Sequence, residues 1–379
     1  MQKKIVFLTG TRADYGKLKS LMLKVENHNQ FELHIFATGM HLLSKYGLTY
    51  REIEKDGFSN IYRFINQQNN SQMDIALSNT VLGFSNYVSE IKPDLIIVHG
   101  DRLEALAGAI VGALNNIKVA HIEGGEVSGT IDESIRHSIT KLAHIHFVAN
   151  EEAKHRVKQL GEAEESIHII GSPDIDIMNS DELPSIEAVK ERYSIPYKKY
   201  SILMYHPVTT ETHLLKDKIK NVVSAVVNSN KNFIVIYPNN DEGSSIILSE
   251  YEKLINLDNF KIYPSIRFEY FLTLLKHCEL IIGNSSAGVR EASVYGIPSI
   301  DLGRRQQGRY DIKLQNNILH LNEEQDQIIK SLSNINKKKF ESISYYGQGN
   351  SDEKFIATLE SETIWRMEYQ KLFVDMDNV

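Results

Sequence analysis

Short apolar runs alternate with longer helical patterns along the first half of the chain. A helical stretch from about Asp14 to Glu26 follows the first run, and a helix rich in Ala and Leu follows the third. The runs that we predict to be strands span 5–8, 31–37, 95–98, 118–122, 145–148 and 167–170. Strands that alternate with helices predict a parallel sheet covered by helices on both faces.

The same alternation restarts after residues 181–196, a charged segment with two prolines that suits a domain boundary. Further strands are predicted at 201–205, 233–237, 280–282 and 299–302. Residues 347–350 are predicted to form a loop, and 352–372 a helix that contains the only tryptophan, Trp365. With 379 residues the chain is long enough for two domains, each with its own core.

Composition narrows the range of functions. The net charge of −7 gives no basic field for a nucleic-acid partner, so none is expected. Cys278 is the only cysteine, which excludes an intrachain disulfide framework and suits a buried thiol in a reducing compartment. The first apolar run is too short for a signal-peptide core or a membrane span, and no later run is long enough. We therefore expect a cytoplasmic protein without a membrane partner.

Polar residues cluster directly after the strand-like runs. In open parallel sheets, ligands bind at the carboxyl ends of the strands. Five clusters occupy that position across the two predicted sheets: 10–12, 99–102, 121–125, His206 and 283–286. Their common position predicts a ligand site in the cleft between the two domains.

The region from Asn284 to Arg309 suits a nucleotide diphosphate. Small residues at 284–288 allow a close backbone approach, and the N–H groups of a following helix bind anions, although Ser285 also suits an ordinary helix cap. Glu291 has the position to accept bonds from ribose hydroxyls, or only to interact with the helix dipole. Three arginines at 304–309 suit phosphate recognition, or form a solvated basic loop.

Acidic residues gather near the strand ends of the first domain, together with His99, His121 and His137. Removal of a weakly acidic C–H proton requires a positioned base of tuned pKa. The histidines show no tight spacing of metal ligands, so we predict no metal. The acidic residues in question are Asp101, Glu123, Glu126, Asp132 and Glu133.

Taken together, the motifs resemble the hydrolysing UDP-N-acetylglucosamine 2-epimerases of bacterial sialic-acid synthesis and the epimerase half of the bifunctional animal enzyme. The resemblance covers nearly the whole chain, and the block HIEGGEVSGTIDESIRHSITKLAHIHF at 121–147 is its most specific part. The other anchors are TGTRADYGKL (9–18), HGDRLEALA (99–107), YHPVTTE (205–211), YPNND (237–241) and GNSSAGVREA (283–292).

The resemblance implies a glycosyltransferase-B-like α/β fold of two Rossmann-like domains, 1–175 and 176–355, with a C-terminal helix at 356–379 that returns to the first domain. It implies no cofactor, and a homodimer or dimer of dimers. The implied catalytic acids are Asp101, Glu123 and Asp132, whereas the family varies between Asp and Glu at position 133. The implied contacts to UDP are Arg12, Ala13, Arg102, His206, Asn239, Ile266, Ser285, Ser286, Glu291 and Arg305, of which Ile266 rests on spacing alone.

The implied reaction is elimination of UDP from the UDP-sugar, followed by hydration of the resulting 2-acetamidoglucal. UDP-N-acetylglucosamine is the preferred substrate, and UDP-2,4-diacetamido-2,4,6-trideoxyglucose of legionaminic-acid synthesis is the alternative. Residues 12–15 and 125–130 favour the hydrolysing branch over one that returns UDP-N-acetylmannosamine. A glycosyltransferase and a non-catalytic UDP-sugar sensor on the same fold remain further alternatives.

Overall fold

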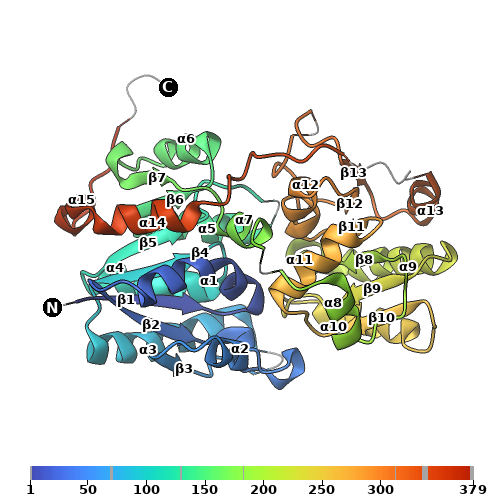
Figure 1. The fold of residues 1–379 in the computed structure, drawn as a ribbon, viewed down its shortest axis with the longest axis horizontal. Helices are drawn as coiled ribbons and strands as arrows, with labels where there is room; N and C mark the ends of the chain where they lie inside the picture. The colour runs from blue at the N-terminus through green and yellow to red at the C-terminus, as the bar shows by residue number, and fades with distance from the viewer. Residues whose placement is uncertain are drawn as a thin grey trace. The chain divides into compact units, whose positions relative to one another are not determined.

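The computed structural model describes residues 2–68, 71–128, 130–181, 183–311, 313–334 and 340–375. The chain divides into two compact units (Figure 1). Unit 1 comprises Met1–Glu126, Asp132–Ser180 and Tyr345–Val379, and unit 2 comprises Val127–Ile131 and Asp181–Ser344. The boundaries predicted from the sequence are 175 and 355.

Unit 1 is built on a parallel sheet in the order β3-β2-β1-β4-β5-β6-β7. Its strands are β1 (Lys3–Thr9), β2 (Phe31–Ala37), β3 (Ile61–Arg63), β4 (Leu95–His99), β5 (Lys118–Ile122), β6 (Ile145–Val148) and β7 (Ile167–Ile169). Its helices are α1 (Arg12–Glu26), α2 (Tyr50–Lys55), α3 (Met73–Ile91), α4 (Leu103–Leu114), α5 (Ile131–Leu142), α6 (Glu151–Gln159), α7 (Pro173–Met178), α14 (Ser351–Glu360) and α15 (Glu362–Arg366).

Alternate residues of the central strands enter two different cores. Ile5 and Phe7 of β1 pack with α1, α14 and α15, whereas Val6 and Leu8 pack with α3, α4 and α5. A strand with a core on each face is apolar at every position, which explains the uninterrupted apolar runs in the sequence.

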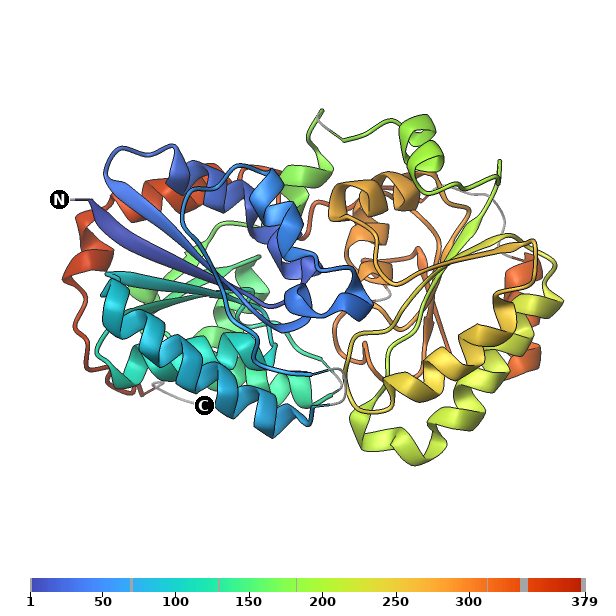
Figure 2. The ribbon, with the colours of Figure 1, turned by 90° about the horizontal axis from the view of Figure 1, so that it is seen from below.

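The C-terminal segment packs on the first core of unit 1, where α14 lies beside α1 (Figures 1 and 2). The ring centroid of Phe355 lies 6.2 Å from that of Phe7 and 5.0 Å from that of Phe147. The single helix predicted at 352–372 is wrong in its extent. Ser361 adopts extended backbone and its hydroxyl caps α15, so the chain forms two short helices that end at Arg366.

Unit 2 repeats the order of the first six strands of unit 1, as β10-β9-β8-β11-β12-β13, with all strands parallel. The strands are β8 (Ser201–Met204), β9 (Phe233–Ile236), β10 (Phe260–Tyr263), β11 (Ile281–Gly283), β12 (Ser299–Leu302) and β13 (Ile318–Leu321). The helices are α8 (Ile186–Arg192), α9 (Thr212–Asn228), α10 (Ser244–Tyr251), α11 (Phe268–His277), α12 (Glu291–Val294) and α13 (Gln325–Asn334). One core of this unit packs α9, α10 and α13 against the sheet.

All ten predicted strands are confirmed, each with ends within two residues of the prediction. Three strands were missed, namely β3, β10 and β13, and all three lie at sheet edges. Each has only partial burial, so the local sequence lacks a continuous apolar run. Within the described parts of the chain, no helix combines the length and the hydrophobicity that a membrane crossing requires.

Candidate functional site

The predicted catalytic acids of unit 1 surround a buried arginine. Arg136, on α5, is 1% exposed and forms an ion pair with Asp101, which follows β4. Its Nη1 also donates to the backbone carbonyl of Glu126 at 3.4 Å. Burial lowers the pKa of Arg136, but the charges of Asp101, Glu123, Glu126 and Asp132 outweigh it and raise that pKa above the ordinary value. The fold thus brings residues from three segments into one electrostatic cluster.

Glu123 sits at the end of β5 with its backbone in the left-handed region, at φ of 71°. This conformation is uncommon for a residue with a side chain, and it persists only where the surrounding structure holds it. Here the Glu123 N–H donates to the carbonyl of Phe147 at 3.0 Å, and Glu123 Oε2 lies 2.9 Å from His99 Nε2. The strained backbone places the carboxylate beside the end of β4.

The side chain of His121, on β5, connects the end of β4 to helix α5. Its Nε2 donates to the carbonyl of Gly100 at 2.8 Å, so its Nδ1 accepts from the hydroxyl of Thr140 at 3.1 Å. Burial lowers the pKa of His121 to about 3, which keeps the ring neutral and preserves this tautomer. His121 therefore holds the backbone that precedes Asp101.

A second buried histidine gives a prediction about pH. Burial lowers the pKa of His41 from its ordinary value of 6.5 to about 4, while its ring lies between the hydroxyls of Thr9 and Thr49. Since the unfolded chain binds the proton more readily, this contribution to stability is complete above pH 6.5 and is lost as the pH falls toward 4. We expect His41→Gln to flatten the decline in the free energy of unfolding between pH 6.5 and 5, by up to about 1.4 kcal/mol per pH unit.

The measurement is urea unfolding of both proteins at several pH values, because the difference between them cancels all other titrating groups. His155→Gln is the matched control, because His155 is exposed. Parallel pH profiles for the wild type and His41→Gln would contradict the assignment.

The start of α1 carries two of the predicted UDP contacts. Thr11 and Asp14 form a capping box, and Arg12 and Ala13 are the first two residues of this 15-residue helix. The backbone N–H groups at such a helix start favour an anion. Arg12 forms an ion pair with Glu52 of α2, and this pair fixes the position of its guanidinium.

In unit 2, Asn284 connects several of the predicted UDP contacts. Its side chain accepts from the His206 backbone N–H at 2.6 Å and donates to the His206 carbonyl at 2.9 Å. Its own carbonyl accepts from Arg305 at 3.2 Å and from Gln306 at 2.8 Å. His206 Nδ1 in turn accepts from the backbone N–H of Asn239 at 3.1 Å. His206, Asn239 and Arg305 are thereby brought into one network.

The turn before Asn284 requires glycine. Gly283 has a φ of 138°, and an added Cβ would lie 1.8 Å from the carbonyl oxygen of Met204. The adjacent strands β8 and β11 can approach each other there only because the side chain is absent.

The helix expected after the two serines is short and does not start directly after them. Ser286–Gly288 form a single 3-10 turn capped by the Ser285 hydroxyl, and α12 spans only Glu291–Val294. The predicted anion site at a helix start is therefore corrected to a capped 3-10 turn. Glu291 is 3% exposed at the first position of α12. Ile266 is buried in the loop between β10 and α11 and takes no part in the hydrogen bonds of Asn284.

Sequence reasoning missed Arg136 and Gln306. Arg136 lies four residues after Asp132 on α5, so the two share a helix face, and that spacing was the available signal. Gln306 lies in the arginine-rich segment 304–309 and was not predicted to be a site residue, although it is fully buried. Among the described residues, no group of three His, Cys, Asp or Glu side chains could hold a metal ion.

The sequence and the fold of the chain resemble those of known proteins. The family model described as UDP-N-acetylglucosamine 2-epimerase matches residues 23–360. A protein of Neisseria meningitidis serogroup B, named UDP-N-acetylglucosamine 2-epimerase, is 48% identical over 99% of this chain and 100% of its own length. The chain belongs to the UDP-N-acetylglucosamine 2-epimerase family. It is an enzyme of that family, as its motifs suggested.

Other relatives of this epimerase family refine the comparison. A Legionella pneumophila protein named UDP-N,N'-diacetylbacillosamine 2-epimerase (hydrolyzing) is 34% identical over 95% of this chain and 96% of its own length. The crystal structure of a Neisseria meningitidis UDP-GlcNAc 2-epimerase bound to UDP-GlcNAc superposes with a TM-score of 0.79. It is 18% identical and covers 94% of this chain and 99% of its own. The predicted glycosyltransferase-B-like α/β fold is confirmed.

Proposed function

We propose that this epimerase is of the hydrolysing type and converts UDP-N-acetylglucosamine to UDP and N-acetylmannosamine. The observation that carries the proposal is the cluster of Asp101, Glu123 and Asp132 about Arg136. Proton transfer on two faces of a sugar ring requires at least two acid or base groups, and this cluster supplies them. The names of the Neisseria and Legionella relatives also support it.

The proposal assigns proton transfer to the acids of unit 1. A carboxylate removes the proton from C2 as the bond between C1 and the UDP oxygen breaks, giving 2-acetamidoglucal and UDP. A second acid returns a proton to C2 from the opposite face, and the oxygen of water bonds to C1 as that water loses a proton. The C2–H becomes acidic only as C1 gains positive character, so nearby carboxylates stabilise the transition state.

The nucleotide is assigned to cationic and hydrogen-bonding groups. In unit 2 these are His206, Asn239, Arg305 and the Ser285–Ser286 turn, with Glu291 for the ribose hydroxyls and Ile266 as a packing contact. In unit 1 they are Arg12, Ala13 and Arg102. Departing UDP carries negative charge, and guanidinium groups bind such oxygens with charge-assisted hydrogen bonds.

Turnover in heavy water tests the proposal directly. We expect UDP and free N-acetylmannosamine that carries one solvent deuterium at C2, because that proton is removed and then replaced from solvent. Nuclear magnetic resonance and mass spectrometry of the product report both features. Product without deuterium would exclude elimination, and UDP-N-acetylmannosamine as the sole product would identify a non-hydrolysing epimerase.

The similarity to the Legionella relative supports UDP-2,4-diacetamido-2,4,6-trideoxyglucose as a second candidate substrate. Comparison of kcat/KM for the two purified UDP-sugars decides between them. Release of UDP without any acceptor separates both from a glycosyltransferase. UDP binding without turnover of either sugar would indicate a sensor.

We expect a homodimer or a dimer of dimers, which sedimentation would measure.

A further inference from the structure

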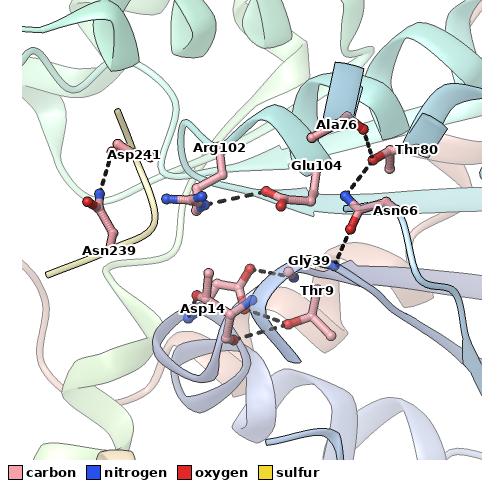
Figure 3. A network of polar contacts seen from close by, with 12 residues as sticks. Thr9, Asp14, Gly39, Asn66, Ala76, Thr80, Arg102, Glu104, Asn239 and Asp241 are labelled. Atoms are coloured by element: carbon pink, nitrogen blue, oxygen red, sulfur yellow. Dashed lines mark hydrogen bonds and ion pairs between the residues drawn. The ribbon is translucent and has the colours of Figure 1, made fainter. Parts of the chain in front are cut away.

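Arg102 and Glu104 lie together just after β4, at the start of α4 (Figure 3). Arg102 precedes the first residue of the helix, and its side chain is 21% exposed. Glu104 lies in the first turn and is 1% exposed, with its Oε2 3.4 Å from Arg102 Nε. A half-buried arginine is thus paired with a buried carboxyl group.

The carboxyl group of Glu104 is seated against the backbone of two glycines. A Cβ added at Gly10 would lie 2.8 Å from Glu104 Cδ, and one added at Gly39 would lie 2.6 Å from Glu104 Oε1. Gly39 also has a φ of 62°, which other residues adopt rarely. The side chain of Glu104 therefore occupies the space that these two glycines leave open, and it has little freedom to move.

Both glycines are themselves fixed by side chains. The Gly10 N–H donates to Asp14 Oδ2 at 2.9 Å, and the Gly39 N–H donates to Asn66 Oδ1 at 3.1 Å. Asn66 then donates to the hydroxyl of Thr80 at 2.8 Å (Figure 3). The two glycine backbones that contact Glu104 are consequently held by α1, through Asp14, and by α3, through Asn66 and Thr80.

The charge of Glu104 is costly in this position. Burial raises its pKa, the nearby charge of Asp14 adds to that rise, and the guanidinium of Arg102 opposes it. An apolar side chain of similar size would fill a buried seat at lower cost than an acid. Stability alone therefore does not account for the acid, whereas orientation of the neighbouring guanidinium does.

We propose that Glu104 is a positioning residue that holds the guanidinium of Arg102 in the orientation that binds the diphosphate of UDP. This inference rests on the proposed function, in which Arg102 contacts UDP. In this role Glu104 acts through Arg102 and does not itself bind UDP. The side chain of Arg102 has several rotatable bonds, so a fixed partner lowers the entropy lost when the diphosphate binds.

A double-mutant cycle tests this inference, after turnover of UDP-N-acetylglucosamine and UDP binding by the wild-type enzyme have tested the proposed function separately. Arg102→Ala, Glu104→Gln and the double variant are compared by calorimetry with UDP and by steady-state kinetics. We expect Arg102→Ala to weaken UDP binding by about 10- to 100-fold, the scale of a lost charged hydrogen bond. Glu104→Gln should weaken it by about 5- to 20-fold with Arg102 present, and by less than about twofold in the Arg102→Ala background.

The loss in Glu104→Gln should appear in KM, with kcat within about threefold of wild type. Glu52→Gln is the matched control, because Glu52 pairs with the other candidate arginine of this unit, Arg12. Its effect should be the same with and without Arg102. Glu104→Met fills the same seat without a polar group, and it replaces Glu104→Gln in the cycle if that variant unfolds.

Equal losses of affinity for the Glu104 variants in both backgrounds would overturn the proposal, as would unchanged affinity with Arg102 present. A lower melting temperature with unaltered UDP affinity would assign Glu104 a structural role only. Unchanged affinity in Arg102→Ala would overturn both the positioning role and the assignment of Arg102 to UDP. Turnover by the wild type would still stand as an independent result.

Discussion

Replacement of Asp101 by Asn, Glu123 by Gln or Asp132 by Asn is expected to lower turnover by about 10²- to 10⁴-fold, the usual contribution of a general acid or base. Each change keeps the size of the side chain and removes its ability to carry a proton. UDP affinity should change much less, because the proposal assigns these groups to the hexose. Steady-state kinetics and calorimetry with UDP measure the two effects separately.

A purely structural role for these acids predicts a different outcome. Neutralisation of a carboxylate that is paired with buried Arg136 would then lower the melting temperature, UDP affinity and turnover together. Glu126→Gln is the matched control, because Glu126 also acts on Arg136 but is not an implied catalyst. Near wild-type turnover in all three folded variants would show that the catalytic centre lies elsewhere.

The same variants can divide the two half-reactions. A variant defective mainly in hydration should release 2-acetamidoglucal together with UDP, whereas one defective in elimination should release neither. Product analysis by mass spectrometry distinguishes them. The residue that removes the C2 proton and the residue that returns one are thereby identified.

Arg136→Met is expected to destabilise the protein by up to about 3–5 kcal/mol, the range for breaking a buried ion pair, because it leaves buried Glu123 and half-buried Asp101 without their cation. Arg136 is 1% exposed, and four carboxylates raise its pKa, so its loss removes the charge that allows them to lie together. Turnover should also fall, because the pKa values of the remaining acids rise when the cation is absent. Chemical denaturation and a pH–rate profile measure both effects.

A second substitution separates charge from packing at this position. Asp101→Asn combined with Arg136→Met should recover part of the lost stability, because it removes one of the carboxylates left unpaired. Arg366→Met is the control, because Arg366 forms an exposed ion pair with Glu362, with its side chain 78% exposed. That variant should change stability by less than about 1 kcal/mol. If Arg136→Met and Arg366→Met destabilised the protein equally, the role given to Arg136 would be refuted.

The local sequence determined the central strands and the position of the candidate chemistry. Strands such as β1 and β4 have cores on both faces, so each contains a run of four consecutive apolar residues, 5–8 and 95–98, that the sequence alone reveals. Polar residues at their carboxyl ends had to meet at one edge, because all strands of the sheet are parallel. The motifs at those ends also indicated the family, which the relatives confirmed.

Only the tertiary structure decided which residues act on one another. Arg136 meets Asp101 across 35 residues of sequence, and Asn284 meets His206 across 78, so no local pattern records either pair. The edge strands β3, β10 and β13 were missed because each is only partly buried and so needs no continuous apolar run. The left-handed backbone of Glu123 and the seat of Glu104 between Gly10 and Gly39 arise in the same way. They depend on packing between segments that are distant in the chain, and packing exists only once the chain has folded.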